Sequence, residues 1–395
     1  MSAGPKPFDA NAVPSPAPIA EEQAEQPAGP ATTRPVAAEP APEPADPIDT
    51  RQLGATLAAA MQDGGFHPVI LFGTAASGKT SLLLSLFSTL IAEPRLEAGL
   101  VLCDPLLGAR NTTGRQIHDQ ARHTFEVKTQ AFLDRIKIPR TNIDLPFFIP
   151  VELRPADGKF AARFAFMESN GEFYRPERDS LRSPGGASFL YKDLQEEIEE
   201  FIATYEGAIT FLYLAPYTQS EVYADPDVQA DLEELKSASQ AIQGVLASYD
   251  RIRAGDRSHD FHLMLVTKWD AHAARSADHT IGIAEDREAL DRFVQQRYPQ
   301  ALAALQAIKV APDQRALNAY CSGIIDERGL RPRSINDDVL ADVQSYPIRL
   351  WTRLYGNALA AHGAVRVSPF PQPPQKHVLV RAFHRVLDLV SGHRP

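Results

Sequence analysis

Short apolar runs alternate with longer, more polar stretches through most of the chain. The runs are typical of buried strands, whereas the stretches between them repeat apolar residues every three or four positions, as amphipathic helices do. This alternation predicts an α/β fold with a mostly parallel sheet and helices on both faces. Strands are expected at 68–72, 99–104, 147–153, 160–167, 208–214, 261–266 and 315–321, and helices at 49–63, from 79 onward, and at 116–136, 191–205, 227–253, 285–307 and 347–361.

Two of the expected strands are joined by a short turn. Asp157 and Gly158 form the Asp-Gly pair that is typical of a tight hairpin. The strands at 147–153 and 160–167 are therefore expected to pair antiparallel, which gives the sheet one antiparallel hairpin strand.

A glycine-bounded loop follows the first strand. From Gly73 to Thr80 it matches the phosphate-binding pattern G-x-x-x-x-G-K-[ST], placed between a strand and a helix as that pattern requires. The glycines let backbone N–H groups point inward at an anion, Lys79 adds a point charge, and the Thr80 hydroxyl suits Mg²⁺. The loop therefore predicts binding of a nucleoside triphosphate with Mg²⁺. The residues expected to contact the nucleotide are Gly73, Thr74, Ala75, Ala76, Ser77, Gly78, Lys79, Thr80 and Ser81.

Composition and charge limit the class of partner. The 395 residues include 40 Lys and Arg and 50 Asp and Glu, for a formal net charge of −10. This acidic balance does not favour binding to nucleic acid. Cys103 and Cys321 lie in apolar runs and are expected as buried thiols rather than as a disulfide. The sequence shows neither a signal-peptide pattern nor an apolar run long enough to span a bilayer, so a cytoplasmic location is expected.

Three segments differ in composition. Residues 1–50 are rich in Pro, Ala and Glu and are expected to form a disordered arm. Residues 51–363 are expected to form one P-loop domain with an enlarged switch region. Residues 364–395 combine a Pro-rich linker with an amphipathic helix. That helix is expected either to fold back on the domain or to dock onto a protein partner, with binding to a membrane surface as a third alternative. The segment 105–140 is the other place where a protein partner is expected, and the bases of 109–140 are expected on a solvated face or on this partner surface.

Three further short motifs follow strands in a fixed order. They are Glu168–Gly171 (ESNG), Thr267–Asp270 (TKWD) and Cys321–Gly323 (CSG). Together with the phosphate loop, this order resembles that of the Ras-like, translation-factor-related P-loop GTPases, and the organisation is similar to that of the bacterial double-GTPase group. The resemblance covers roughly residues 66–360, and these short motifs alone carry it.

The resemblance implies roles around the terminal phosphate. Glu168, in the position of the family aspartate, would hold Mg²⁺, usually through water. The N–H of Gly171 would sense the γ-phosphate. Glu172 stands where Ras-like members carry the glutamine that orients the attacking water. Two interpretations of Glu172 stay open, a catalytic acid and a solvated surface acid.

The resemblance also implies a switch threonine, whose hydroxyl coordinates Mg²⁺ and whose N–H contacts the γ-phosphate. Thr141 lies just before the first strand of the hairpin, where the family places this residue. Thr112 and Thr113 remain alternatives.

The Thr267–Asp270 motif resembles the guanine motif Asn/Thr-Lys-x-Asp. The Asp270 carboxylate would accept two hydrogen bonds from the N–H and NH₂ edge of guanine, which adenine cannot offer, so guanine would be preferred. The stem of Lys268 would cover the base. Thr267 takes the place of the commoner asparagine, which braces this loop against the phosphate loop, and the N–H of Ser322 would contact the guanine oxygen.

The motifs together predict a molecular switch that binds GTP and GDP, uses Mg²⁺, hydrolyses GTP slowly and acts through partner proteins. Slow hydrolysis is expected because no glutamine follows Gly171. The resemblance adds two reasons: in Ras-like switches a side chain at the position of Ala75 crowds the space used by that glutamine, and Ala76 takes the place of the asparagine found in potassium-activated relatives. Two alternatives stay open, a P-loop ATPase or kinase that uses Asp104, and a module that binds nucleotide without hydrolysing it.

Overall fold

The structure is a computed structural model of the chain. It describes residues 53–74, 77–93, 96–100, 119–134, 147–155, 160–168, 196–217, 226–253, 259–269, 283–322, 325–326, 331–332, 337–364 and 366–370. Backbone contacts divide the chain into two units, Met1–Pro44 and Ala45–Pro395, and every described residue belongs to the second. The arm expected over 1–50 and the helix expected near the C-terminus lie outside the described residues.

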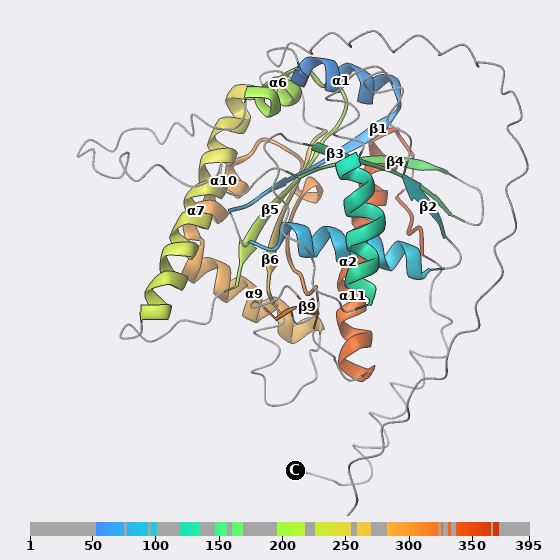
Figure 1. Cartoon of the computed structure of the whole chain (residues 1–395). Helices are drawn as coiled ribbons and strands as arrows, with labels where there is room; N and C mark the ends of the chain where they lie inside the picture. The colour runs from blue at the N-terminus through green and yellow to red at the C-terminus, as the bar shows by residue number, and fades with distance from the viewer. Residues whose placement is uncertain are drawn as a thin grey trace, which may run out of the picture. The chain divides into compact units, whose positions relative to one another are not determined.

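A mostly parallel sheet runs through the described part of the chain (Figure 1). Its strand order is β2-β3-β4-β1-β5-β6-β7, and β3 alone runs against the others, because it pairs antiparallel with both β2 and β4. The expected α/β sheet with one antiparallel strand is thereby confirmed. The strands are β1 Phe66–Phe72, β2 Leu96–Leu100, β3 Phe147–Pro155, β4 Ala162–Glu168, β5 Thr210–Pro216, β6 Phe261–Thr267 and β7 Arg315–Ala319, with a separate pair formed by β8 Ile325–Asp326 and β9 Arg331–Pro332.

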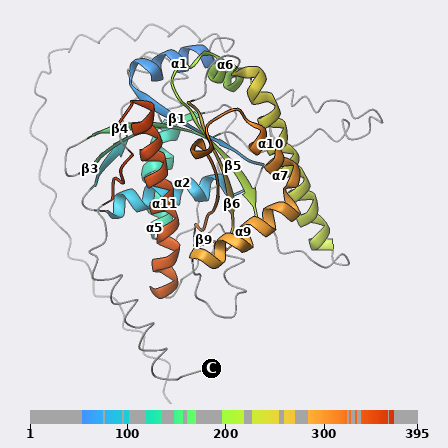
Figure 2. The ribbon, with the colours of Figure 1, turned by 180° about the vertical axis from the view of Figure 1, so that it is seen from behind.

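Helices pack on both faces of the sheet (Figures 1 and 2). They are α1 Leu53–Asp63, α2 Lys79–Ala92, the π-helix η2 His123–Lys128, α5 Thr129–Leu133, α6 Glu196–Thr204, α7 Pro226–Ile252, α9 Ile283–Arg297, α10 Pro299–Ala307, the 3₁₀ turn η5 Pro312–Gln314 and α11 Asp337–Ala361. On one face, the ring of Trp351 in α11 lies 5.4 Å from that of Phe164 in β4. On the other, Phe201 in α6 lies 5.2 Å from Phe148 in β3. None of the described helices is both long and apolar enough to cross a membrane.

Two helices differ from the expectation. The helix expected over 285–307 is interrupted at Tyr298, whose backbone is not helical (φ −128°, ψ 39°), and Pro299 begins α10 at a position that proline favours. The closing helix begins at Asp337 rather than at Pro347. Proline is typical of a helix start, which is why the sequence pattern put the boundary there. In the structure Pro347 lies inside α11, where it removes one backbone donor.

The loop after β1 lies at the centre of the sheet, where successive strands are added first on one side of β1 and then on the other. β1 lies between β4 and β5 and is parallel to both. The chain leaves β1 through α2 towards β2 on one side, and later passes from β4 through α6 to β5 on the other. In open α/β sheets, ligands bind outside the carboxyl ends of the strands at such a switch point. The fold therefore gathers the loop after β1 and the ends of β4 and β6 at one edge of the sheet.

Candidate functional site

Lys79, the first residue of α2, closes the loop that follows β1. Its Nζ donates hydrogen bonds to the backbone oxygens of Gly73 (2.5 Å) and Thr74 (2.9 Å). The side chain is buried, and burial lowers its pKa to about 8, while the nearby Glu168 carboxylate opposes that change. Lys79 is thus a positive charge held inside the loop near neutral pH.

Two glycines are required by the shape of this loop. A Cβ on Gly73 would lie 2.3 Å from the Oγ of Ser77, and Gly78 has a φ of +92°, in the left-handed region that favours glycine. Gly78 directly precedes α2. The first N–H groups of that helix have no partners within it and carry the positive end of the helix dipole, so they are suited to an anion.

Thr80 joins the start of α2 to the end of β4. Its Oγ1 donates a hydrogen bond to Oε1 of Glu168 at 2.6 Å. Glu168 is the last residue of β4 and is 3 % exposed. Burial raises the pKa of its carboxyl group, while the hydrogen bond from Thr80 and the charges of Lys79 and Lys128 act in the opposite direction. Two side chains that are distant in the sequence therefore present oxygen atoms at one point beside the loop.

The oxygen atoms at this point have the chemistry of a magnesium site. Three buried oxygens have no hydrogen-bond partner among the described residues, namely Oε2 of Glu168, Oγ of Ser77 and Oγ1 of Thr74. Hydroxyl and carboxylate oxygens are the ligands that Mg²⁺ accepts, and it usually takes only one or two carboxylates together with water and phosphate oxygens. In the described part of the chain, no group of three or more His, Cys, Asp or Glu side chains is arranged so that it could hold a metal ion. Thr80 and Glu168 therefore fit Mg²⁺ better than a transition metal.

Thr267 ties the end of β6 to the phosphate loop. Its Oγ1 donates a hydrogen bond of 2.6 Å to the backbone oxygen of Ser77, and its side chain is buried. A Cβ on Gly78 would lie 3.5 Å from the Cβ of Thr267. This hydrogen bond joins the loop after β6 directly to the loop after β1.

Trp269 anchors the loop that Thr267 begins. The indole is fully buried, 5.4 Å from the ring of Tyr217 and 6.0 Å from that of Phe293. Its backbone N–H donates to the oxygen of Tyr320, and Lys268 before it has a left-handed backbone with φ of 57°. The sequence motif treats the position of Trp269 as variable, so only its apolar character hinted at this anchoring role.

Ser322 follows β7 at the same edge of the sheet and is half-buried. Two residues earlier, Tyr320 accepts from Trp269, and its hydroxyl forms a short hydrogen bond with Ser85 in α2. The end of β7 is thus held next to the loop after β6, and Cys321 is buried as expected.

Several expected site residues lie outside the described residues. They are Ala75 and Ala76 in the phosphate loop, Asp104, Thr112, Thr113 and Thr141 between β2 and β3, Gly171 and Glu172 after β4, and Asp270 after Trp269. The described members of the expected site are Gly73, Thr74, Ser77, Gly78, Lys79, Thr80, Ser81, Glu168, Thr267, Lys268 and Ser322.

Lys128 is a charged residue of this region that the sequence pattern did not single out. The bases of 109–140 are expected on a solvated or partner surface, but Lys128 is only 2 % exposed, so that expectation is wrong for this residue. Burial lowers its pKa, and the Glu168 carboxylate opposes the change. The spacing of buried residues along 116–136 was the signal available for it, since Lys128 follows Phe125 by three positions on one helix face.

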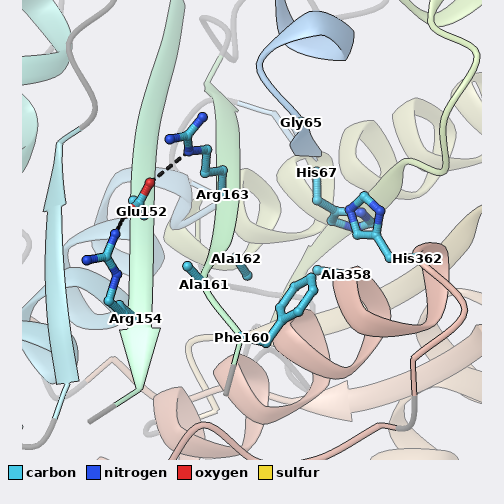
Figure 3. A pocket seen from close by; sticks show the side chains of 10 residues that line it. All are labelled: Gly65, His67, Glu152, Arg154, Phe160, Ala161, Ala162, Arg163, Ala358 and His362. Carbon is cyan, nitrogen blue, oxygen red and sulfur yellow. Dashed lines mark hydrogen bonds and ion pairs between the residues drawn. The ribbon is translucent and has the colours of Figure 1, made fainter. Parts of the chain in front are cut away.

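A pocket lies at the end of the strands opposite the phosphate loop (Figure 3). This pocket has a volume of about 360 Å³ and lies at the amino ends of β1 and β4, where Glu152 accepts hydrogen bonds from Arg154 (2.6 Å) and Arg163 (2.7 Å). Both arginines therefore share one carboxylate at the rim of the pocket. None of the expected site residues lines this pocket, which includes Gly65, His67, Phe160, Ala161, Ala162, Ala358 and His362.

The described residues define a Rossmann-like α/β domain with a mostly parallel sheet and a candidate site at its central switch point. No protein-family model and no curated protein matches the sequence.

Proposed function

We propose that this protein binds GTP with Mg²⁺ and hydrolyses it slowly, as a switch that acts through partner proteins. The observation that carries the proposal is the hydrogen bond from Thr267 to Ser77, 2.6 Å long. It joins the loop after β6, which carries the motif that resembles the guanine motif, to the phosphate loop. One nucleotide can contact both loops with its base and its phosphates only if the loops lie side by side. A GTPase-like version of the α/β fold is part of the proposal.

In the proposed complex, Lys79 and the loop amides bind the phosphates, and Asp270, directly after the anchored Trp269, selects guanine. Thr80 and Glu168 would organise Mg²⁺, which neutralises charge on the β- and γ-phosphates when bound. Lys79 would exchange its hydrogen bonds to backbone oxygens for phosphate oxygens. Because those backbone bonds already hold its amine inside the loop, little side-chain freedom remains to be lost on binding.

Hydrolysis in this proposal is an in-line attack of water on the γ-phosphate. Lys79 and the loop N–H groups stabilise the charge that develops on the phosphate oxygens. Gly171 would hold the γ-phosphate, while Thr141 and Glu172 are the proposed switch residues beside it. Without a glutamine after Gly171 to orient water, single-turnover hydrolysis is expected to stay well below about one per second, the lower end of ordinary enzyme rates.

The position of Glu168 supports this proposal over an ATPase or kinase that uses Asp104. Glu168 ends the strand next to β1 and contacts Thr80 at the start of α2. Asp104 lies outside the described residues, and β2, the described strand before it, is at the edge of the sheet. The contact with Thr80 therefore favours Glu168 as the acid for a metal at the phosphate loop.

Nucleotide selectivity tests the proposal. Fluorescent GDP and ADP analogues are titrated into the full-length protein with Mg²⁺. GDP is expected to bind at least about a hundredfold more tightly than ADP, because adenine would leave the Asp270 carboxylate without hydrogen-bond donors. Asp270→Ala is expected to abolish most of this preference, and Lys79→Ala to weaken both nucleotides.

Lys309→Ala, on an exposed lysine after α10, is the matched control and is expected to change neither affinity. Equal or tighter binding of ADP would exclude the guanine assignment. Binding of neither nucleotide would exclude the nucleotide site as a whole.

A further inference from the structure

The pocket in Figure 3 is formed by segments that are distant in the sequence. Its walls come from the starts of β1 and β4, the end of β3 and the end of α11. Its volume of about 360 Å³ lies within the range of small-molecule sites, about 300–1,000 Å³, and a cavity of about 150 Å³ is enough for benzene. The pocket can therefore hold an aromatic ring that carries a polar arm.

The two sides of the pocket differ in chemistry. Figure 3 shows the charged side chains on one side and Phe160 with the two histidines on the other. The rings of Phe160 and His362 lie 6.0 Å apart. The lining also includes Ala161, Ala162 and Ala358, whose small side chains leave the space open, and Ala161 is the exposed one of the three. These apolar surfaces suit the body of an organic molecule.

His67 is a buried polar group in the wall of the pocket. Its side chain is 3 % exposed, and its Nε2 forms a hydrogen bond of 2.8 Å with Oγ1 of Thr210, which also accepts one of 3.4 Å from Nδ2 of Asn357. Burial lowers the pKa of His67 to about 3, so the ring is neutral at physiological pH. Its second ring nitrogen makes no hydrogen bond within the described part of the chain. His67 therefore adds a hydrogen-bonding group to the pocket but no charge.

The charge of the pocket is concentrated in three side chains at its rim. Oε1 of Glu152 accepts from Arg154 at 2.6 Å, and its Oε2 accepts from Arg163 at 2.7 Å. The hydrogen bond from Arg163 is the main reason that the pKa of Glu152 is lowered, so this carboxyl group stays ionised at neutral pH. Two positive charges and one negative charge leave the rim with an excess of one positive charge. Both guanidinium groups are about half exposed and have further N–H groups for a ligand.

We propose that this pocket binds a small carboxylic acid with an aromatic or aliphatic body. One excess positive charge matches one carboxylate, and a guanidinium group offers paired N–H donors to its two oxygens. Phe160 and the three alanines cover the body, and His67 offers it a hydrogen bond. None of the residues expected to contact the nucleotide lines this pocket, so the inference does not depend on GTP binding.

The test titrates 1-naphthylacetate into the full-length protein in a calorimeter. The neutral 1-naphthylacetamide has the same body without the charge. We expect the acid to bind at least about tenfold more tightly than the amide, as one hydrogen bond to a charged group provides. Equal affinities for the two compounds would overturn the carboxylate assignment, and binding of neither compound at millimolar concentration would overturn the pocket as a ligand site.

Arg154→Gln removes the excess charge and leaves Glu152 paired with Arg163. It is expected to abolish most of the preference for the acid while the affinity for the amide stays the same. Arg251→Gln, which removes an exposed base paired with Glu199, is the matched control and is expected to keep the preference. An unchanged preference in Arg154→Gln would show that the rim does not recognise the carboxylate.

Ala161→Leu places a larger side chain at the exposed position of the pocket wall. It is expected to weaken both compounds at least about tenfold with little change in thermal stability, whereas Ala303→Leu on the exposed side of α10 is expected to change neither affinity. Wild-type affinities in Ala161→Leu would mean that the compounds bind elsewhere, and that result would overturn the inference. The same titration with Mg²⁺-GDP present is expected to give the same affinity for the acid, and competition between the two would assign the acid to the phosphate loop instead. A chain that binds the acid but no guanine nucleotide would exclude only the proposed function.

Discussion

Hydroxyl groups of individual threonines hold the candidate site together. Thr80 donates to Glu168 and Thr267 donates to Ser77, both at 2.6 Å, and each bond joins segments that are far apart in the sequence. Threonine suits this task because its β-branched side chain has few rotamers, so little freedom is lost when the bond forms. The two bonds connect the ends of β4 and β6 to the phosphate loop, and the relative position of these segments depends on them.

Removing one hydroxyl tests this dependence. Thr267→Val replaces it with a methyl group of similar size and leaves the Ser77 carbonyl without this donor. We expect the free energy of unfolding to fall by about 1–3 kcal/mol, because a buried carbonyl oxygen loses its partner. Affinity for GDP is expected to fall by about tenfold, because the base-recognition loop is no longer fixed to the phosphate loop. Urea unfolding without nucleotide and a GDP titration measure the two effects.

Thr267→Ser is the control for this change, since it keeps the hydroxyl and removes only a methyl group. It is expected to bind GDP nearly as the wild-type chain does. Unchanged GDP affinity in Thr267→Val would show that the loops keep their relative position without this bond.

Among the secondary-structure elements, the buried strands were predicted well from the sequence, whereas some helix boundaries were not. The strands β1, β5 and β6 are buried along their whole length and mostly apolar, so their positions followed from the sequence. The break at Tyr298 agrees with a local signal, since Pro299 takes the helix-start position that proline favours, and the Tyr298 hydroxyl donates to the backbone oxygen of Pro216 in β5. The early start of α11 goes against such a signal, because Pro347 lies inside the helix.

The same difference applies to the candidate site. Lys79, Thr80 and Thr267 stand in contiguous motifs whose chemistry is local, and the sequence identified them. The burial of Lys128 was missed because its own segment carries many charges and reads as a solvated face. Its burial follows from packing, since the helix that contains it lies against α2 through Phe125 and Phe87.

A buried ion pair connects the ends of the helices α6 and α7 to the start of β6. Arg253, directly after α7, donates two hydrogen bonds of 2.8 Å to Asp260, just before β6, and both side chains are 1 % exposed. Arg253 also donates to the oxygens of Ile202 in α6 and of Gly207. Asp260 accepts from Tyr249 in α7 at 2.8 Å. This network fixes where α6 and α7 end relative to β6.

Arg253→Met is expected to destabilise the fold strongly. The change leaves a buried, unpaired carboxylate on Asp260, which costs about 3–5 kcal/mol in comparable cases. The free energy of unfolding from urea denaturation measures the effect. Arg122→Met, which breaks an exposed pair with Glu126, is the control and is expected to have no measurable effect.

The double variant Arg253→Met with Asp260→Leu removes both charges together. It is expected to recover a large part of the lost stability, because an apolar pair needs no compensation. A double variant that is no more stable than Arg253→Met would show that the backbone contacts of Arg253, rather than the ion pair, are the main source of the effect.

For the molecule as a whole, two buried histidines make stability depend on pH. His67 in β1 bonds Thr210 in β5 at 2.8 Å, and His262 in β6 bonds Tyr213 in β5 at 2.9 Å. Burial lowers the pKa of His67 to about 3, with Asp260 opposing the change and His362 adding to it. The pKa of His262 falls to about 4, again chiefly by burial. Both rings therefore stay neutral in the folded chain at pH values where the unfolded chain is protonated.

The sign of the pH dependence follows from this difference. Unfolded histidine binds a proton below about pH 6.5, so between that pH and about 4 the unfolded state carries more protons and stability falls as pH falls. Each histidine contributes a slope of up to about 1.4 kcal/mol per pH unit. Burial raises the pKa of Glu168, so the folded state takes up a proton there first, which offsets part of the slope above the usual carboxyl pKa. Urea unfolding at a series of pH values from 7 downwards, without nucleotide, measures the net slope.

His67→Gln separates the contribution of one ring from the rest. Glutamine remains neutral and keeps a polar group that can bond Thr210, so the slope is expected to decrease by about 1.4 kcal/mol per pH unit relative to the wild-type chain. His259→Gln, at an exposed histidine just before β6, is the matched control and is expected to leave the slope unchanged. Equal slopes in His67→Gln and the wild-type chain would mean that His67 takes up its proton in the folded state as readily as in the unfolded one. In that case the amino ends of β1 and β5 would open to solvent without global unfolding, because the pKa of about 3 requires the ring to stay buried between them.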